Sequence, residues 1–302
     1  MKDRTINKFT DKTSGILNFA DLKKLRYKLL YWCMFALLFL VSLICLLPTL
    51  WVALSGFKDV SEMYAVAPTL FPKSFDLGKV KEVWEKVKLY KYFKNSFILI
   101  AGCWAVDISV NGAAGYVLSK LRPIGSRLIE TAVFWSMLLP GISMVPLYMT
   151  WCDVPLIHTS LVGSYAPIWL MAGTSAFNIL LFRNFFNGIP IEYLEAARID
   201  GCTNLGIFIR IIMPLSKPIV MVVTIFSITG TWSNFMWPYM LLQNSGKEPM
   251  SVALYLLSGN SSGLLENEYM ILLFISVIPM IIIYAFFSKY IIGGLNVGGI
   301  KG

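Results

Sequence analysis

The sequence is poor in charge and in the residues that enzymes use for chemistry. Charged residues make up 14% of the 302 residues, whereas a soluble domain carries about a quarter. His158 is the one histidine, and the cysteines have neither metal nor disulfide spacing: Cys33, Cys45, Cys103, Cys152 and Cys202. Because no cluster of His, Cys and carboxylate residues and no nucleophile elbow occurs, we expect neither a metal site nor a membrane-embedded enzyme.

The sequence also lacks a phosphate-binding loop of the form G-x-x-x-x-G-K-[ST]. Gly246-Lys247 is followed by Glu248 and lacks the first glycine. We therefore expect no nucleotide and no other cofactor on this chain. The net charge of +9 would suit a nucleic-acid partner, but no nucleic-acid-binding motif accompanies it, and basic residues in such a chain more often mark cytoplasmic loops.

Apolar residues are abundant and occur in long runs. They form 57% of the chain, and the mean hydropathy is +0.67. A bilayer core of about 30 Å needs about 20 apolar residues in a helix. The runs of that length are 29–54, 96–118, 128–149, 161–182, 219–242 and 269–290. The sequence therefore predicts an all-α, multi-pass protein of the cell membrane with six transmembrane helices.

The distribution of Lys and Arg predicts the orientation in the membrane. Residues 120–127, 151–160, 183–217 and 243–268 contain three, none, four and one of them. Positively charged loops favour the cytoplasm, so both termini and loop 183–217 are expected there. Segment 56–95 is in tension with this, because it would lie outside with eight lysines, balanced in part by five acids. The predicted division is a basic cytoplasmic segment 1–28, a membrane domain 29–290 and a cytoplasmic tail 291–302.

Residues 189–218 form a polar, basic and helix-prone insert between two apolar runs. Pro190 can open a helix, because its missing N–H would be unpaired there anyway. Gly201 can end that helix in the left-handed conformation, and Thr203 or Asn204 can cap the next one. The pattern predicts two short helices joined by a glycine turn on the membrane surface.

The spacing in this insert resembles the EAA signature of binding-protein-dependent ABC importer permeases, written EAA-x3-G-x9-I-x-L-P. The matching residues are Glu195-Ala196-Ala197, Gly201, Ile211 and Met213-Pro214, with Met213 where the family prefers Leu. The fuller wording EAARIDG resembles the carbohydrate branch of the family. The terminal sequence GGLNVGGIKG resembles the tail of the second permease subunit in maltose-type systems.

This resemblance implies a type I ABC importer permease fold and a set of partners. These are a homologous second permease, an ATPase dimer that binds MgATP, and an extracytoplasmic protein that delivers a di- or oligosaccharide. Loop 186–218 would hold the coupling helix, and the residues implied to contact the ATPase are Glu195, Ala196, Ala197, Asp200, Gly201, Gly298, Gly299 and Lys301. The outer loop with Gly259, Asn260, Ser261 and Ser262 would contact the binding protein, although from sequence alone an idle connection fits equally well.

Polar residues inside the apolar runs indicate where cargo could pass, because such groups are costly in a membrane. Asp107 and Asn111 share one face of the second run. They could bind sugar hydroxyls or make a structural bond to a neighbouring helix. Aromatic and amide groups that could hold a sugar are Trp232, Asn234, Trp237 and, more weakly, Tyr148; a lipid-facing aromatic belt is the alternative.

Two rival functions remain open from the residues. The cargo could be a polyol or a glycerol phosphodiester, although the scarcity of Lys and Arg in the spans argues against an anion. The chain could also be an ion-coupled secondary transporter that uses Asp107. Against this, the sequence shows neither broken helices in two corresponding halves nor several buried acids.

Overall fold

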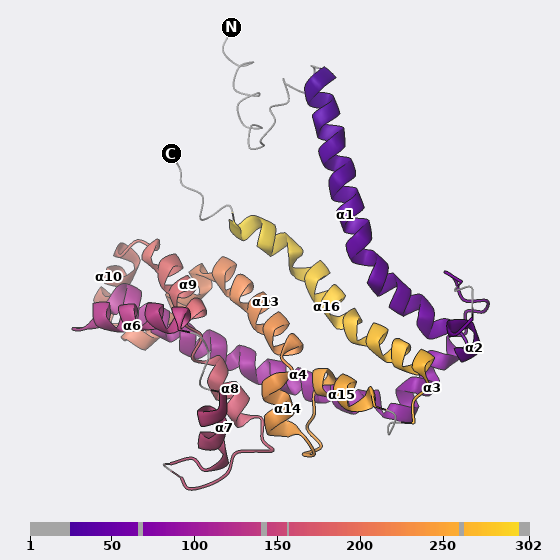
Figure 1. Cartoon of the computed structure of the whole chain (residues 1–302). Coiled ribbons are helices and arrows are strands. Elements are labelled where there is room, and N and C mark those ends of the chain that lie inside the picture. The colour runs from indigo at the N-terminus through magenta and orange to yellow at the C-terminus, as the bar shows by residue number, and fades with distance from the viewer. Residues whose placement is uncertain (1–24, 66–68, 140–143, 156, 260–262, 296–302) are drawn as a thin grey trace.

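The computed structural model describes residues 25–65, 69–139, 144–155, 157–259 and 263–295 (Figure 1). These residues are mostly helical, and within them the one β-bridge joins Val154 to Thr159. The first helix, α1 (Leu25–Phe57), is followed by the short α2 (Val60–Met63) and α3 (Gly78–Val87). The second long helix, which we call the second rod, is continuous. It contains α4 (Leu89–Val106), the π-helical turn η2 (Asp107–Asn111), α5 (Gly112–Tyr116) and the π-helical turn η3 (Val117–Leu121).

Shorter helices fill the middle of the chain. In order they are α6 (Ser126–Leu138), α7 (Met144–Cys152), α8 (Ala166–Ala172), α9 (Ala176–Asn187), α10 (Glu192–Ile199), α11 (Asn204–Ile207), the π-helical turn η4 (Phe208–Ile212), α12 (Met213–Leu215), α13 (Lys217–Ser233), α14 (Met236–Leu242) and α15 (Met250–Leu257). The last helix is α16 (Glu266–Leu295). The all-helical membrane fold predicted from the sequence is confirmed.

The apolar runs and the helices differ in length and continuity. Three described helices are long and apolar enough to span a membrane: Lys28–Phe57, Leu89–Leu121 and Glu266–Ser288. A fourth is obtained if Asn204–Leu215 and Lys217–Ser233, which meet at 85°, count as one span. The second helix is longer than the apolar run predicts, because it begins at Leu89 and not at residue 96. The count of six spans and the cytoplasmic position of the termini stay predictions.

Runs 128–149, 161–182 and 219–242 each contain two helices where the sequence predicted one. In the fourth run, α9 begins anew after Gly173, because the Ser175 side chain accepts a hydrogen bond from the Asn178 N–H (3.3 Å) and caps it. In the fifth run, Asn234 has extended backbone (ψ 117°) and separates α13 from α14. A hydropathy average over a window does not detect such local breaks.

The long helices pack on one another in a chain of contacts. Helix α1 contacts α16, and the two helices meet near α2 and α3 and diverge from there; α16 also packs on α13, α13 packs on α4, and α5 packs on α9 (Figure 1). In the most apolar 18-residue stretch of Lys28–Phe57, 0% of the residues are buried within the chain. This part of α1 therefore presents its side chains to lipid or to another polypeptide. Most of the interior therefore lies around the second rod, α9 and α13.

Several lysines of the predicted outer segment are neutralised by carboxylates. Lys79 Nζ lies 2.7 Å from Asp59 Oδ1, and this hydrogen-bonded ammonium holds the pKa of the Asp59 carboxyl below its usual value. Lys86 Nζ lies 2.7 Å from Glu268 Oε2 and ties α3 to the start of α16. These ion pairs hold α3 against the end of α1 and the start of α16.

Glycine allows the second rod and α9 to pack closely. A Cβ built on Gly115 would lie 2.7 Å from the Phe182 Cβ and 3.0 Å from the Arg183 backbone nitrogen. Small residues at such crossings let two membrane helices approach, and the resulting van der Waals packing holds the helices together. Gly115 is thus needed for close approach, and not for a special backbone angle.

We predict that Gly115→Ala lowers the thermal unfolding midpoint of the protein in detergent. The added methyl group meets backbone atoms that cannot move cheaply, and overpacking of this kind costs about 1–3 kcal/mol. Gly230→Ala is the matched control, because Gly230 is also in a helix and its Cβ would meet nothing within 4 Å. Equal midpoints for the two variants would contradict the proposed close crossing.

Candidate functional site

The insert between the apolar runs folds as two short helices with a glycine turn, as predicted. Gly201 has φ +78°, and the Cys202 N–H donates to the Ala197 carbonyl (2.9 Å), which closes the end of α10. The Thr203 hydroxyl accepts from the Gly206 N–H (3.2 Å) and caps α11. One detail is corrected: α10 begins at Glu192, so Pro190 precedes the helix and does not open it.

Helix α10 has one buried face and one open face. Leu194 (0% exposed) and Ala197 (5%) point into the protein, whereas Glu195 and Ala196 are exposed. Asp200 and Gly201 are exposed too, and a Cβ on Gly201 would meet nothing within 4 Å. Apolar side chains also lie on the open side, and Ile199 is 87% exposed. An exposed surface of this composition suits a protein contact.

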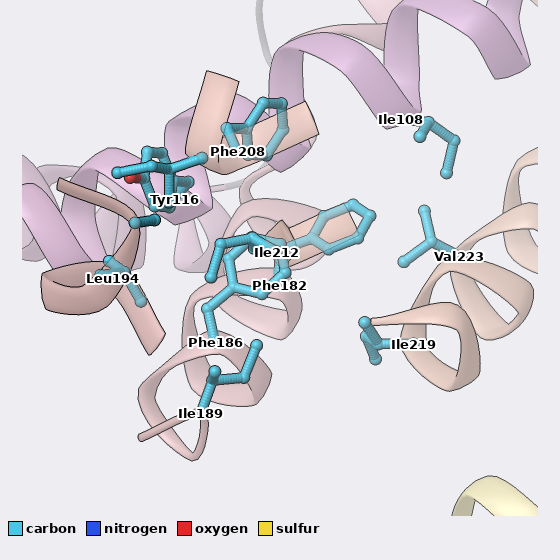
Figure 2. Packing of buried hydrophobic residues seen from close by; sticks show 12 residues of the cluster. Ile108, Tyr116, Phe182, Phe186, Ile189, Leu194, Phe208, Ile212, Ile219 and Val223 are labelled. Carbon is cyan, nitrogen blue, oxygen red and sulfur yellow. The ribbon is translucent and has the colours of Figure 1, made fainter. Parts of the chain in front are cut away.

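A cluster of buried apolar side chains connects α10 to the second rod (Figure 2). Leu194 lies in the cluster with Tyr116 of the rod, and the Tyr116 and Phe208 rings are 5.3 Å apart. Phe182 and Phe186 of α9 stack at 5.5 Å in its centre. We call this set, which also includes Ile108, Ile212, Ile219 and Val223, the junction cluster.

A hydrogen bond supplements the junction cluster at the end of the second rod. Lys120 Nζ donates to the Ile189 carbonyl at 2.5 Å, directly before α10. Ile108, at the other end of the cluster, is adjacent in sequence to Asp107 (Figure 2). The exposed helix and the polar interior are thus linked by packed side chains throughout.

Asp107 is held inside the bundle by two amides. The Asn178 Nδ2 donates to both carboxylate oxygens, at 2.9 and 3.0 Å. The Asn111 Nδ2 donates to Asp107 Oδ1 at 2.6 Å and to the Ala172 carbonyl at 2.9 Å. Asp107 is 3% exposed, so these bonds replace water as the partners of a buried carboxylate.

A cavity of about 360 Å³ opens beside this carboxylate, between the second rod, α8–α9 and α13–α14. Polar or aromatic groups in its lining include Asp107, Asn178, Ser227, Thr231, Asn234 and Trp237. Among its described lining residues, Asp107 is the one charged side chain. The arrangement offers hydrogen-bonding groups and an indole face to a polar, uncharged molecule.

The structure brings together only some of the residues singled out from the sequence. Asp107, Asn234 and Trp237 share the cavity, while Asn111 lies behind Asp107 with 0% exposure. Trp232 lies elsewhere, with its ring 6.0 Å from that of Phe93.

Tyr148 is half-buried and packs in the same apolar cluster as Trp237. It does not line the cavity.

Three cavity residues with amide or hydroxyl groups were missed: Ser175, Asn178 and Ser227. Asn178 lies in an apolar run, so the cost of a buried amide would have identified it as it did Asp107.

Several predicted contacts lie outside the described residues. These are Gly298, Gly299 and Lys301 of the tail and Asn260, Ser261 and Ser262 of the outer loop. Gly259 is described and exposed, two residues after the end of α15.

Comparison with known proteins identifies the family. The model of the family described as "Binding-protein-dependent transport system inner membrane component" matches residues 112–296. This range includes the EAA motif, helices α8, α9, α13 and α14 of the Asp107 cavity, and α16 up to its last described residue. The chain belongs to this family. It is therefore a multi-pass permease component of an ABC transporter, a transport subunit and not an enzyme, and its EAA motif fits the family.

Relatives of similar length support this assignment. The polygalacturonan/rhamnogalacturonan transport system permease protein YtcP of Bacillus subtilis is 29% identical over 89% of this chain and 96% of its own length. The arabinooligosaccharides transport system permease protein AraQ of the same organism is 32% identical over 90% and 94%.

Comparison with solved structures supports the same fold. A chain of a bacterial ABC transporter involved in the import of the acidic polysaccharide alginate has a TM-score of 0.77 and 23% identity, over 88% of this chain and 98% of that one.

We predict that Asp107→Asn lowers the thermal unfolding midpoint. The carboxylate accepts three N–H bonds, whereas a carboxamide has one oxygen and would turn its own NH₂ group towards other donors. Buried groups left unpaired cost about 1–3 kcal/mol each. Asp200→Asn, at an exposed position, is the control and is expected to unfold like the wild type. A loss no larger than that of the control would show that the amide network is not stabilising.

Proposed function

We propose that this chain forms half of the translocation pathway of an ATP-driven importer of neutral oligosaccharides. The observation that carries the proposal is the polar cavity at Asp107, which is joined through the junction cluster to the exposed helix α10. The cavity would hold the cargo, and α10 would receive the motion of a separate ATPase. A separate ATPase is needed because the sequence contains no phosphate-binding loop of the Walker type.

The cavity chemistry supports a sugar as cargo. Amide and hydroxyl groups can form hydrogen bonds with particular hydroxyl groups of a sugar, and the Trp237 indole can stack on the C–H face of a sugar ring. The amides and hydroxyls belong to Asn178, Ser227, Thr231 and Asn234. Relatives that are named for their cargo transport arabinooligosaccharides, polygalacturonan or rhamnogalacturonan, and alginate.

The charge of the cavity favours a neutral member of this class. Neither Lys nor Arg occurs among the described lining residues, and the Asp107 carboxylate would repel a uronate or a glycerol phosphodiester. A polyol is compatible with the same groups and remains the second candidate.

Helix α10 supports coupling to an ATPase subunit. Its inner residues are fixed in the junction cluster, so a rigid displacement of its open face would be passed to α9 and to the second rod. Close approach on the open face is favoured by Ala196 and Gly201, which have little or no side chain. The remaining partners we infer are a homologous second permease, an ATPase dimer and an extracytoplasmic binding protein, with the latter at the loop that begins at Gly259. Transport would proceed by alternating access.

An ion-coupled secondary transporter is disfavoured by the same geometry. Asp107 already accepts three hydrogen bonds from amides, and no second acid accompanies it in the described cavity lining. A coupled ion or proton would have to displace these amide donors from the carboxylate.

The test combines isolation with uptake and uses Gly201 variants. We expect the tagged wild-type chain to co-purify with a second permease and an ATPase, and to support ATP-dependent uptake of a neutral oligosaccharide. Gly201→Asp should abolish uptake while the chain still inserts, because a charged side chain then stands on the contact face. Gly201→Ala is the control: its Cβ meets nothing, and the left-handed backbone costs about 1–2 kcal/mol.

Three results would contradict the proposal. They are isolation without an ATPase, ATP-independent uptake under an ion gradient, and unchanged uptake by Gly201→Asp. A preference for an oligogalacturonate over a neutral oligosaccharide would contradict the cargo alone.

A further inference from the structure

A second cavity, of about 440 Å³, lies on the other side of the break between α13 and α14. Thr231 and Asn234 line the Asp107 cavity, whereas their neighbours Trp232, Ser233 and Phe235 line the second one. The same five-residue stretch therefore separates two cavities. The second one is completed by α15 and α16.

The lining of the second cavity combines aromatic rings with hydroxyl groups. The rings include Trp232, Tyr255 and Tyr269, and the hydroxyls include Ser233, Ser251 and Ser258. The described lining contains no charged side chain. Tyr255 is 55% exposed, and its ring lies 5.3 Å from that of Phe235, so part of this aromatic surface is accessible from outside.

The hydroxyl groups are oriented as hydrogen-bond acceptors. Ser251 Oγ donates to the Asn234 carbonyl (2.8 Å), Ser258 Oγ to the Tyr255 carbonyl (2.7 Å) and Tyr269 Oη to the Leu254 carbonyl (3.1 Å). In this arrangement each proton is donated to the backbone, so the oxygens face the cavity as acceptors; the Ser258 and Tyr269 hydroxyls also contact each other. A ligand that donates several O–H groups and offers an apolar ring face matches this surface.

A lipid chain matches the second cavity less well than a sugar does. Hydrocarbon offers no donor to the hydroxyl oxygens, whose protons are already bonded to the backbone. The cavity also adjoins α15, whose end leads to Gly259 and the loop implied to contact a sugar-binding protein. The Ser251 bond to Asn234 ties it to the Asp107 cavity.

We propose that this second cavity is an entry subsite, which one ring of an oligosaccharide occupies next to the Asp107 cavity during transport. The inference rests on the function proposed above. Trp232 and Tyr255 provide the stacking surfaces, and Ser251, Ser258 and Tyr269 accept bonds from the sugar hydroxyls. Ser233, which is exposed, supplies a further hydroxyl at the boundary between the two cavities.

The test is uptake of a radiolabelled neutral trisaccharide such as arabinotriose by the complete transporter carrying Ser233→Ala or Ser233→Leu. Loss of one hydrogen bond, about 0.5–1.5 kcal/mol, should raise the half-saturation concentration of Ser233→Ala about 2- to 10-fold. Ser233→Leu should nearly abolish uptake, because its apolar branch occupies the cavity. Met236→Leu is the control, since Met236 is exposed on α14 and lines neither cavity.

The amount of assembled complex and its unstimulated ATPase rate should be equal in all four proteins. Wild-type half-saturation in Ser233→Ala, or wild-type uptake in Ser233→Leu, would overturn the entry subsite and leave the importer function intact. If the wild type imports no oligosaccharide, the proposed function itself fails, and the subsite with it.

Discussion

The Asp107 carboxylate is buried in an apolar bundle and depends on amides from two helices for its hydrogen bonds. Asn178 reaches it from α9, and Asn111 binds both the carboxylate and the end of α8. Because an unpaired carboxylate is very costly at this depth, the second rod, α8 and α9 must keep one register. At Gly115, further along the second rod, the close contact with α9 holds these two helices in the same register. The hydrogen bonds of the Asp107 carboxylate therefore fix the wall of the polar cavity as much as apolar packing does.

The junction cluster extends this fixed unit to the membrane surface. Phe182 and Phe186 belong to the same helix as Asn178, and they pack with Leu194 of α10. A force applied to the open face of α10 would act on the side chains that hold the cavity wall, without a flexible connection between them. By contrast, α1 contacts mainly α16 and stands apart from this unit (Figure 1). In the alternating-access cycle proposed above, this central unit would turn against α1.

Much of the helical architecture and of the surface motif was predictable from sequence, because each follows from local chemistry. Apolar length predicted the membrane helices, and glycine and threonine chemistry predicted the turn at Gly201 and the cap at Thr203. The helix breaks at Ser175 and Asn234 were not predicted, because one polar residue hardly changes a hydropathy average. Asp107 was recognised by the cost of its charge, but its partner Asn178 and the separation of Trp232 from Trp237 depend on how distant segments pack. Sequence periodicity does not contain that information.

The central claim is that α10 and the wall of the cavity move as one body. It is tested most directly by spin-label distances in the assembled transporter, with and without ATP and vanadate. One pair of labels would join Ile199 on α10 to Leu170 on α8, which lines the cavity, and the other would join Ile199 to Leu43 on α1; all three side chains are exposed. The account predicts that the first distance stays constant while the second changes. A change in the first distance with a constant second distance would contradict it.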